Sequence, residues 1–232
     1  MCEELGDIGF ERVAAVDGAT IPEGTKSLTR FELACLASHQ QIWRHMLDGP
    51  DPQVCVLEDD LYLSRGFGEL LREAGWIPPD AHAVKLDTYF QKVILGEARK
   101  APGGLAMARL YSRHESSAAY ILTREGAKRY LELTAKPTLP ADYALFPKNP
   151  RRFGLVVYQI TPAVALQDHL RAADEGGKIF ATAVRPGPKT RRSLSRRLSR
   201  ESARLVEHLS DLRETAYLKG AVRTRSTVVG VE

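Results

Sequence analysis

The stretch QVCVLEDD, residues 53–60, decides how this chain folds. Residues 53–57 are mostly apolar and β-branched, which predicts a short strand buried on both faces, as in a parallel sheet. Three carboxylates, Glu58, Asp59 and Asp60, follow this strand directly. Ligands of open α/β sheets bind outside the carboxyl ends of the strands. The stretch therefore predicts both an α/β sheet and a binding site at its edge.

Short apolar runs alternate with amphipathic helical patterns on both sides of this strand, which is typical of an α/β domain. The clearest helix is expected from Thr29 to Leu47, because Thr29 and Glu32 form a capping box and Gly49 ends the pattern. Further strands are expected at residues 12–16, 83–86, 117–122 and 155–160, and further helices at residues 67–76 and 124–133. Residues 87–116 have no clear period and are expected to form a functional loop or a hairpin.

Composition is that of a globular protein: 232 residues, 44% hydrophobic and 27% charged. No run reaches the ~18 apolar residues of a membrane span, and the acidic start MCEELGDIGF does not resemble a signal peptide. Cys2, Cys35 and Cys55 show no CxxC spacing. This favours reduced thiols in a cytoplasmic protein over a disulfide framework or a zinc cluster.

Charge is unevenly distributed along the chain. Residues 176–232 carry 13 Lys and Arg against 5 Asp and Glu, whereas residues 1–175 carry 20 against 24. We expect a globular domain over residues 1–175, a linker over 176–192 and a basic amphipathic helical tail over 193–232. An acidic body with a basic end is not typical of a nucleic-acid-binding domain, so no nucleic-acid partner is expected.

The tail is expected to be helical over residues 193–218, with leucines on one face and arginines elsewhere. One interpretation is a helix that packs on the body or on a partner helix. The other is a helix that lies on an anionic membrane surface, which would place the protein at the inner face of the plasma membrane.

Three neighbouring carboxylates repel one another, and burial raises their pKa values unless a cation compensates. Oxygen-rich sites of this kind suit Mg²⁺ or Mn²⁺. Alternate residues of an extended segment point the same way, so Glu58 and Asp60 are the expected pair of ligands. The alternative is an exposed acidic turn that binds nothing.

Six blocks of the sequence, in this order, resemble glycosyltransferase family 25, which includes bacterial lipooligosaccharide galactosyltransferases and the domains that galactosylate collagen hydroxylysine. The blocks are AVDG (15–18), LTRFELACLASHQQIW (28–43), VLEDDLYL (56–63), AVKLD (83–87), SSAAYILTREGAKRYL (116–131) and PADYALF (140–146). The resemblance runs from about Phe10 to Gln167. It implies a GT-A-like, Rossmann-type sheet that binds a nucleotide sugar and is flanked by helices.

The resemblance also implies an activity. A hexose, with galactose as the first expectation, would pass with inversion from a UDP-sugar to a saccharide acceptor of a cell-surface glycan, lipid-linked acceptors included, with Mn²⁺ or Mg²⁺ as cofactor. Asp60 would be the main metal ligand, and Glu58 or Asp59 would contact the ribose or a metal-bound water. The block over residues 28–43 adds four candidates for donor binding, namely Arg30, Glu32, Ser38 and His39.

Two of these candidates have ordinary structural interpretations as well. Glu32 completes the capping box of the helix that starts after Thr29. His39 lies on the apolar stripe of the same helix, where a packed, hydrogen-bonded core histidine is the common case.

Inverting transfer requires a carboxylate that deprotonates the acceptor hydroxyl. The resemblance points to Asp142 as this base, and Asp87, after the strand at residues 83–86, is the competing candidate. Asp142 follows Pro140 at a helix start, so its structural alternative is a helix cap. Lys85 is expected either to reach a donor phosphate or to stabilise a carboxylate.

Two features depart from the family pattern. Phe31 stands where the family usually has glycine. We also expect the family's opening strand and basic turn to be missing, because Met1 falls in the segment that follows them; a misplaced start, a truncated gene or an inactive relative would explain this. A catalytically inactive relative that binds a glycan or a partner enzyme is therefore the second hypothesis. A metal-dependent phosphohydrolase that uses residues 58–60 is the third.

Overall fold

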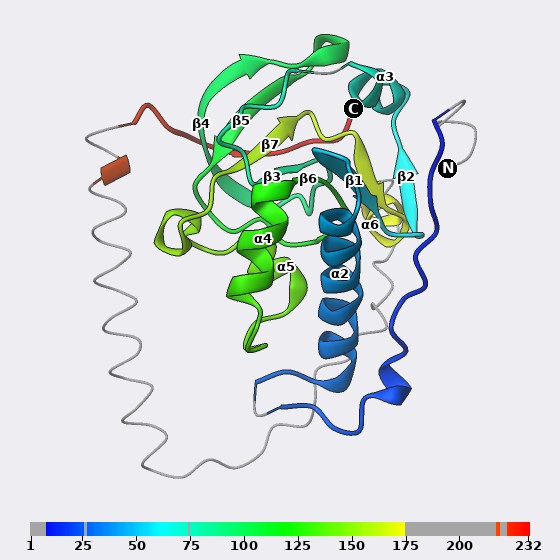
Figure 1. Cartoon of the computed structure of the whole chain (residues 1–232). Coiled ribbons are helices and arrows are strands. Elements are labelled where there is room, and N and C mark those ends of the chain that lie inside the picture. The colour runs from blue at the N-terminus through cyan, green and yellow to red at the C-terminus, as the bar shows by residue number, and fades with distance from the viewer. Residues whose placement is uncertain (1–7, 26, 74, 175–216, 219–221) are drawn as a thin grey trace.

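A computed structural model describes residues 8–25, 27–73, 75–174, 217–218 and 222–232. A seven-stranded mixed sheet forms its centre, with the strand order β1-β6-β3-β7-β5-β4-β9, and a two-stranded sheet, β2-β8, accompanies it (Figure 1). The strands of the large sheet are β1 (Gln53–Leu57), β3 (Ala83–Lys85), β4 (Lys92–Lys100), β5 (Ala106–Leu110), β6 (Ala119–Thr123), β7 (Val157–Thr161) and β9 (Arg225–Val228), and those of the small sheet are β2 (Leu61–Leu63) and β8 (Ala165–Gln167). The helices are α2 (Arg30–Asp48), α3 (Phe67–Arg72), α4 (Arg124–Leu133), α5 (Ala141–Leu145) and α6 (Asp168–Asp174), with 3₁₀ turns η1 (Gly18–Thr20), η2 (Pro102–Gly104) and η3 (Pro150–Phe153).

Strand direction determines where a site can form. Strand β6 is antiparallel to both β1 and β3, and β3 is parallel to β7, so β1, β3 and β7 all run in the same direction. Their carboxyl ends therefore lie at one edge of the sheet. The expected α/β sheet flanked by helices is confirmed. The expectation that β1 is buried on both faces is wrong, because β1 is an edge strand of the described sheet and most of its residues are only half-buried.

Two hydrophobic clusters fill the two faces of the sheet. Helices α2, α4 and α5 cover one face, where Trp43, Tyr120 and Tyr130 are fully buried (Figure 1). Helix α3 and the β2-β8 pair cover the other face with Phe67 and Leu70. Because β-strand side chains alternate between faces, the central strands contribute to both clusters.

Helix α2 begins and ends as the sequence predicts. The Thr29 hydroxyl accepts a hydrogen bond from the Glu32 N–H at 3.2 Å, and the Glu32 carboxylate accepts one from the Thr29 N–H at 2.7 Å. At the other end, the Arg124 guanidinium donates to the carbonyls of Leu47 and Gly49, each at 2.7 Å. A cation that satisfies the free carbonyls of a helix C-terminus stabilises that end. Helix α2 is thereby tied to the start of α4.

The segment over residues 87–116 contains the β4-β5 hairpin, which confirms the hairpin alternative. The strand expected at residues 12–16 is wrong. This segment pairs with no strand among the described residues; instead, the N–H of Val16 donates to the Ser38 hydroxyl on α2 at 2.9 Å, and Asp17 caps η1. A side chain of α2 thus fixes the segment where a sheet edge was expected.

The C-terminal residues complete the sheet. Strand β9 pairs antiparallel with β4, and Val229 is buried in the core. The helical tail expected over residues 193–232 is therefore wrong over β9. The expected linker, 176–192, and the expected amphipathic helix, 193–218, lie outside the described residues, apart from Tyr217 and Leu218.

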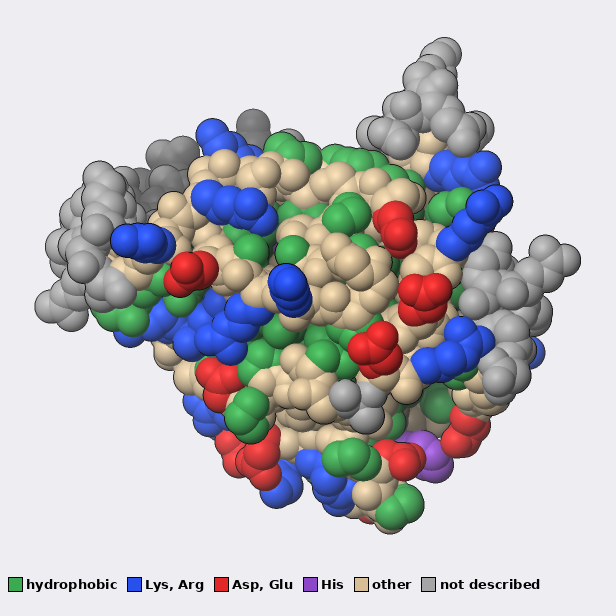
Figure 2. Space-filling view, turned by 90° about the horizontal axis from the view of Figure 1, so that it is seen from above, with side chains coloured by type: hydrophobic (Ala, Val, Ile, Leu, Met, Phe, Trp, Pro, Cys, Tyr) green, Lys and Arg blue, Asp and Glu red, His purple; other side chains and the backbone are tan. Residues whose placement is uncertain are grey.

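Charge on the described surface is mixed. The face seen in Figure 2 carries acidic and basic side chains interspersed among apolar ones. Among the helices of the described ranges, none combines the length and apolar character that crossing a membrane requires.

Candidate functional site

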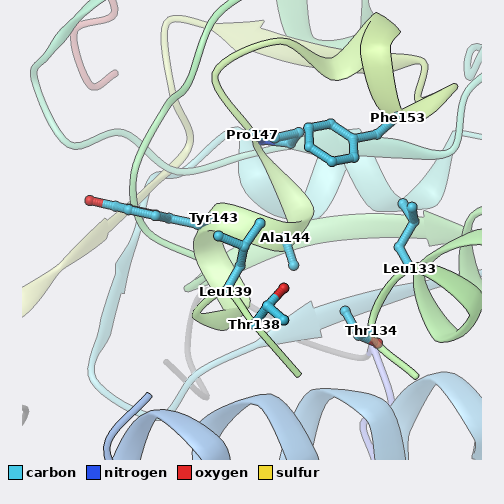
Figure 3. A pocket seen from close by; sticks show the side chains of 8 residues that line it. All are labelled: Leu133, Thr134, Thr138, Leu139, Tyr143, Ala144, Pro147 and Phe153. Atoms are coloured by element: carbon cyan, nitrogen blue, oxygen red, sulfur yellow. The ribbon is translucent and has the colours of Figure 1, made fainter. Parts of the chain in front are cut away.

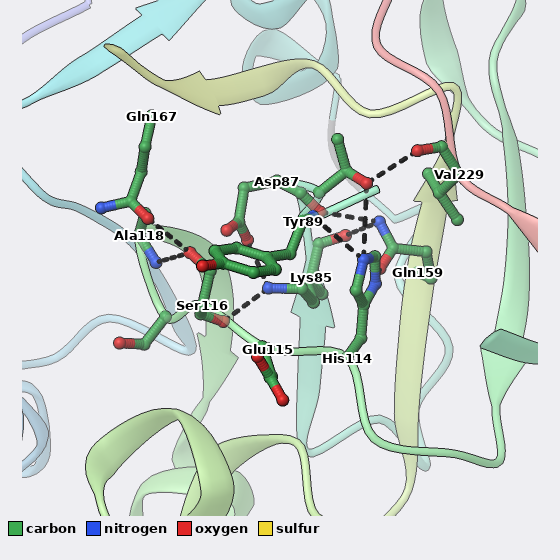
Figure 4. A network of polar contacts seen from close by, with 12 residues as sticks. Lys85, Asp87, Tyr89, His114, Glu115, Ser116, Ala118, Gln159, Gln167 and Val229 are labelled. Carbon is green, nitrogen blue, oxygen red and sulfur yellow. Dashed lines mark hydrogen bonds and ion pairs between the residues drawn. The ribbon is translucent and has the colours of Figure 1, made fainter. Parts of the chain in front are cut away.

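Polar side chains converge at the edge where β1, β3 and β7 end. Glu58 follows β1 directly, and Lys85 and Asp87 lie at the end of β3. The segment before β6 crosses this edge, and the Ser116 carbonyl accepts a hydrogen bond from the Lys85 ammonium (Figure 4). Several charged groups that are distant in sequence thus share one location.

Lys85 is the centre of this cluster. Its Nζ lies 2.7 Å from Oδ1 of Asp87 and 4.5 Å from the centroid of the Phe146 ring, and neither charged side chain has exposed surface. Burial lowers the pKa of Lys85, and the Asp87 carboxylate opposes this shift. Of the two roles expected for Lys85, the structure shows the stabilisation of a carboxylate. A direct contact with a donor phosphate would require an exposed ammonium.

The two candidate bases differ in access. Asp87 is fully buried, and its Oδ2 has no hydrogen-bond partner among the described residues. Asp142 is half-buried, and its Oδ1 accepts a hydrogen bond from the Tyr143 N–H at 2.9 Å. Burial raises the pKa of Asp142, although the Tyr143 N–H and the Lys85 ammonium oppose the shift. Pro140, not Asp142, occupies the N-cap of α5, so the capping alternative is wrong.

Glu58 and Asp60 share one hydrogen-bond donor. The Gln167 Nε2 lies 3.4 Å from Oε2 of Glu58 and 3.2 Å from Oδ2 of Asp60. Burial raises the pKa of Asp60, and the nearby Glu58 carboxylate adds to the shift, although Gln167 opposes it. An amide N–H group thus lies between two carboxylates that repel each other.

This donor set fits a divalent cation, since carboxylate oxygens are the ligands that Mg²⁺ and Mn²⁺ prefer. Within the described ranges, no three His, Cys, Asp or Glu side chains are grouped as a complete metal site. Glu58 and Asp60 would therefore supply part of a coordination shell. Glu58 is half-buried, whereas Asp59 and Asp60 are both exposed.

His39 connects α2 to this pair. Its Nδ1 lies 2.9 Å from the Tyr120 hydroxyl, and its Nε2 lies 3.7 Å from Oε1 of Glu58. The Tyr120 hydroxyl also accepts a hydrogen bond from the Trp43 indole at 2.9 Å. Burial opposes a charged imidazole, yet Tyr120, Cys35 and Glu58 together raise the pKa of His39. His39 is therefore a packed core residue that also positions Glu58.

The pKa of Glu58 shifts in the complementary direction. Burial alone would raise it, but His39, Ser117 and Lys85 lower it overall. The shifts of the two partners agree, as expected for an ion pair between Glu58 and His39.

The other donor-binding candidates on α2 have structural partners. Glu32 closes the capping box, and the Ser38 hydroxyl donates to the Ala34 carbonyl at 2.9 Å. Arg30 is exposed, and its guanidinium lies 4.8 Å from the centroid of the Phe31 ring. Phe31 in turn covers Gly18, where a Cβ atom would lie 2.6 Å from the ring. The structure does not bring Arg30 or Glu32 into the Lys85 cluster, so their contact with a donor stays a prediction.

Comparison with known proteins identifies the family. Residues 8–145, more than half of the chain, match the sequence model of glycosyltransferase family 25, described as LPS biosynthesis protein. The chain belongs to glycosyltransferase family 25. The resemblance stated above is thereby confirmed, and the match includes Glu58, Asp60, Lys85 and Asp142.

Proteins similar to this family 25 chain include ones from Neisseria and Haemophilus. It is 32% identical over 151 residues to the lacto-N-neotetraose biosynthesis glycosyltransferase LgtB of Neisseria gonorrhoeae, which covers 61% of this chain and 54% of the relative. It is 33% identical over 159 residues to LgtE of Neisseria meningitidis serogroup B, in a match that covers 61% of this chain and 54% of LgtE. The lipooligosaccharide biosynthesis protein lex-1 of Haemophilus influenzae is 23% identical over 205 residues, in a match that covers 81% of this chain and 67% of lex-1. The chain spans about half the length of the Neisseria relatives it matches.

A pocket between α4, α5 and η3 does not belong to the cluster. Its lining is Leu133, Thr134, Thr138, Leu139, Tyr143, Ala144, Pro147 and Phe153 (Figure 3). The Tyr143 side chain extends away from it. As far as the described residues line it, the pocket has hydroxyl groups but no carboxylate, amine or imidazole, the groups that the expected chemistry requires.

Sequence reasoning missed several residues of the site of this family 25 chain. Gln167 reaches Glu58 and Asp60 because β8 pairs with β2, which places Gln167 opposite Leu61. Arg113 and Glu115 reach the site on the segment before β6, which has no sequence period. His169, whose buried Nε2 has no hydrogen-bond partner among the described residues, lies close enough to affect the pKa of Asp60. No local pattern in the sequence could have identified these residues.

Proposed function

We propose that this chain transfers a hexose, with galactose as the expected sugar, from a UDP-sugar to a saccharide acceptor during the synthesis of a lipooligosaccharide-type cell-surface glycan. The observation that carries the proposal is the convergence of Glu58, Asp60, Lys85 and Asp142 at the carboxyl edge of the sheet. Membership of family 25 supports it, and so do the names of the relatives, which refer to lacto-N-neotetraose and lipooligosaccharide biosynthesis.

The donor would bind beside the carboxyl end of β1. Asp60 and Glu58 would hold Mn²⁺ or Mg²⁺, which would neutralise the negative charge of the leaving nucleoside diphosphate. His39 keeps the Glu58 carboxylate ionised and fixed against α2. A carboxylate that is already oriented loses little entropy when it binds a ligand.

Asp142 is the proposed general base. It is half-buried and has a raised pKa, whereas Asp87 is fully buried and paired with Lys85. A base with a raised pKa accepts a proton more readily than an ordinary aspartate. In the inverting reaction, the acceptor oxygen bonds to the anomeric carbon, the bond from that carbon to the UDP oxygen breaks, and the hydroxyl proton passes to Asp142.

The proposed setting is cytoplasmic, which is where the free thiols of Cys35 and Cys55 would remain reduced. Contact with an anionic membrane through residues 193–218 stays a prediction, because nearly all of these residues lie outside the described ranges.

Release of UDP from UDP-galactose in the presence of a saccharide acceptor, with and without Mn²⁺, tests the proposal on the full chain. Asp142→Asn is expected to lower kcat by about 10²–10⁴-fold, the usual contribution of a general base. Asp51→Asn is the matched control, because Asp51 precedes β1 at the opposite edge of the sheet. No release of UDP by the wild-type chain would refute the transferase proposal, and full activity of Asp142→Asn would refute the assignment of the base.

A further inference from the structure

Arg113, Glu115 and Tyr143 form a polar and aromatic group that the proposed reaction has not used. The Arg113 guanidinium lies 3.8 Å from the centroid of the Tyr143 ring. The Tyr143 hydroxyl donates to Oε1 of Glu115 at 3.3 Å. All three residues are half-buried, so a ligand can still reach them.

The segment that carries Arg113 and Glu115 is held rigidly. Between them, the buried His114 side chain points inward, and its Nδ1 lies 2.7 Å from Oε1 of Gln159 (Figure 4). The Gln91 amide donates to the Arg113 carbonyl at 2.9 Å and accepts from the Glu115 N–H at 3.3 Å. His114 is fully buried in this irregular segment, whereas Arg113 and Glu115 on either side of it keep part of their surface exposed.

The backbone next to Glu115 is strained. Ser116 has a φ of 76°, in the left-handed region that residues other than glycine rarely adopt. The Lys85 ammonium holds the Ser116 carbonyl in this conformation. Strained backbone that the surrounding contacts keep in place is common at binding and catalytic sites.

This group adjoins the proposed base. Asp142 precedes Tyr143 on α5, and its carboxylate is close enough to Glu115 for the charge of Glu115 to affect its pKa. A ligand that contacts Tyr143 and Glu115 would thus have an atom within reach of Asp142.

The side chains of this group have the chemistry to bind a sugar. A sugar hydroxyl can accept from a guanidinium and donate to a carboxylate, and the C–H face of a pyranose is an apolar surface for an aromatic ring. Glu115, Asp142 and Arg113 are all close enough to Tyr143 for their charges to affect its pKa, and the nearby Lys85 ammonium is paired with Asp87. Two carboxylates therefore outweigh one guanidinium around Tyr143, and the local charge disfavours an acidic ligand.

We propose that Arg113, Glu115 and Tyr143 form the acceptor subsite, which binds the pyranose ring of an uncharged sugar and presents its hydroxyl to Asp142. The inference rests on the proposed function, since it requires a glycosyl acceptor. It adds the residues that select this acceptor and the class of sugar that they take.

Binding of three methyl glycosides to the full chain tests the subsite, with UDP present: methyl β-glucoside, methyl β-galactoside and methyl N-acetyl-β-glucosaminide. We expect at least one to bind, and Tyr143→Ala to weaken that binding about ten-fold, whereas Tyr143→Phe, which keeps the ring, weakens it only about two- to three-fold. Tyr217→Ala is the matched control. Tyr217 also stacks on an arginine, Arg151 at 3.4 Å, but Arg151 lies on η3, before the amino end of β7.

Binding of a charged glycoside tests the selection of uncharged sugars. The wild-type chain is expected to bind methyl β-glucuronide about ten-fold more weakly than methyl β-glucoside, and Glu115→Gln should narrow this difference. Equal affinity for the two glycosides would overturn the selection of uncharged sugars.

The subsite is refuted if none of the three neutral glycosides binds the wild-type chain, or if Tyr143→Ala binds them as the wild type does. Melting temperature and UDP affinity, measured on each variant, show whether the fold and the donor side remain intact. Binding of UDP with Mn²⁺ needs no acceptor, so its absence from the wild type counts against the proposed function. Loss of glycoside binding in a variant with normal UDP affinity supports the subsite.

Discussion

Nζ of Lys85 lies 2.7 Å from Oδ1 of Asp87, and both side chains are fully buried. The same ammonium binds the Ser116 carbonyl and lies over the ring of Phe146. Strand β3, the segment before β6 and the end of α5 therefore meet at one buried charge. This pair connects the sheet to the elements that carry the proposed base and the acceptor subsite.

Lys85→Met should lower the free energy of unfolding by about 3–5 kcal/mol, because it leaves the Asp87 carboxylate buried without a counter-charge. The double variant Lys85→Met with Asp87→Leu should recover a large part of this loss, since it removes both charges. Urea denaturation of the wild type, both single variants and the double variant measures the coupling. A double variant as unstable as the sum of the single variants would show that the two charges do not interact.

The pair of His39 and Glu58 should make stability depend on pH. Because the pKa of Glu58 is lowered in the folded chain, ionised Glu58 stabilises the fold at pH values above 4.5, its ordinary pKa. This contribution is lost as the pH falls through the lowered pKa. Because the pKa of His39 is raised in the folded chain, protonated His39 stabilises the fold at pH values below 6.5, its ordinary pKa. This contribution is lost as the pH rises through the raised pKa. Both contributions are therefore fully present between pH 4.5 and 6.5.

Urea denaturation of His39→Gln and of the wild type over a pH series measures this effect. The difference should be largest in that window and should shrink at alkaline pH. His45→Gln is a matched control on the same helix, because His45 also pairs with a glutamate, Glu11 at 3.1 Å, but in an exposed position where ion pairs contribute little. A difference between His39→Gln and the wild type that stays constant with pH would contradict the prediction.

Asp60 should destabilise the fold when no cation is bound. Its raised pKa means that the ionised carboxylate is disfavoured in the folded chain. The resulting loss of stability is absent at pH values below 3.8, the ordinary pKa, and is complete at pH values above the raised pKa. Asp60→Asn should therefore raise the melting temperature at neutral pH in the absence of metal. It should also abolish UDP-dependent Mn²⁺ binding in calorimetry.

For the melting temperature, Asp59→Asn is the control: Asp59 and Asp60 are both exposed, but it is Asp60 that contacts Gln167 and lies close enough to Glu58 for that charge to affect its pKa. Equal affinity for Mn²⁺ in the presence of UDP in wild type and Asp60→Asn would rule out Asp60 as the metal ligand.

The sequence predicted those parts of the fold that depend on contacts between residues close together in the chain. Thr29, Glu32 and Gly49 fixed the limits of α2 because caps and stop signals act within one turn of a helix. The antiparallel partner of β1 and the position of β9 beside β4 were not predictable in this way. These depend on pairing between segments far apart in sequence, which no local pattern contains.

The candidate site shows the same division. Glu58, Asp60, Lys85 and Asp87 directly follow or end strands, so sequence reasoning could place them at one edge. Gln167 reaches that edge only through the β2-β8 register, and Arg113 meets Tyr143 through the packing of two irregular segments. These contacts became visible only with the tertiary structure.

Gly126→Ala should destabilise the chain even though alanine favours helices. Gly126 is in the first turn of α4, where its N–H donates to the Thr123 hydroxyl at 3.1 Å, and a Cβ atom there would collide with the carbonyl group of His82. Helix propensity favours alanine by about 1 kcal/mol, but the collision is with backbone, and overpacking of this kind costs about 1–3 kcal/mol or more. Because the Thr123 hydroxyl also donates to the Ala81 carbonyl at 2.7 Å, α4 has little freedom to move away.

Urea denaturation should therefore show a net loss of stability in Gly126→Ala. Gly230→Ala is the control, because a Cβ there meets nothing within 4 Å, and it should stay within about 0.5 kcal/mol of the wild type. A Gly126→Ala variant more stable than the wild type would mean that α4 shifts to accept the methyl group and that the contact with His82 does not fix its position.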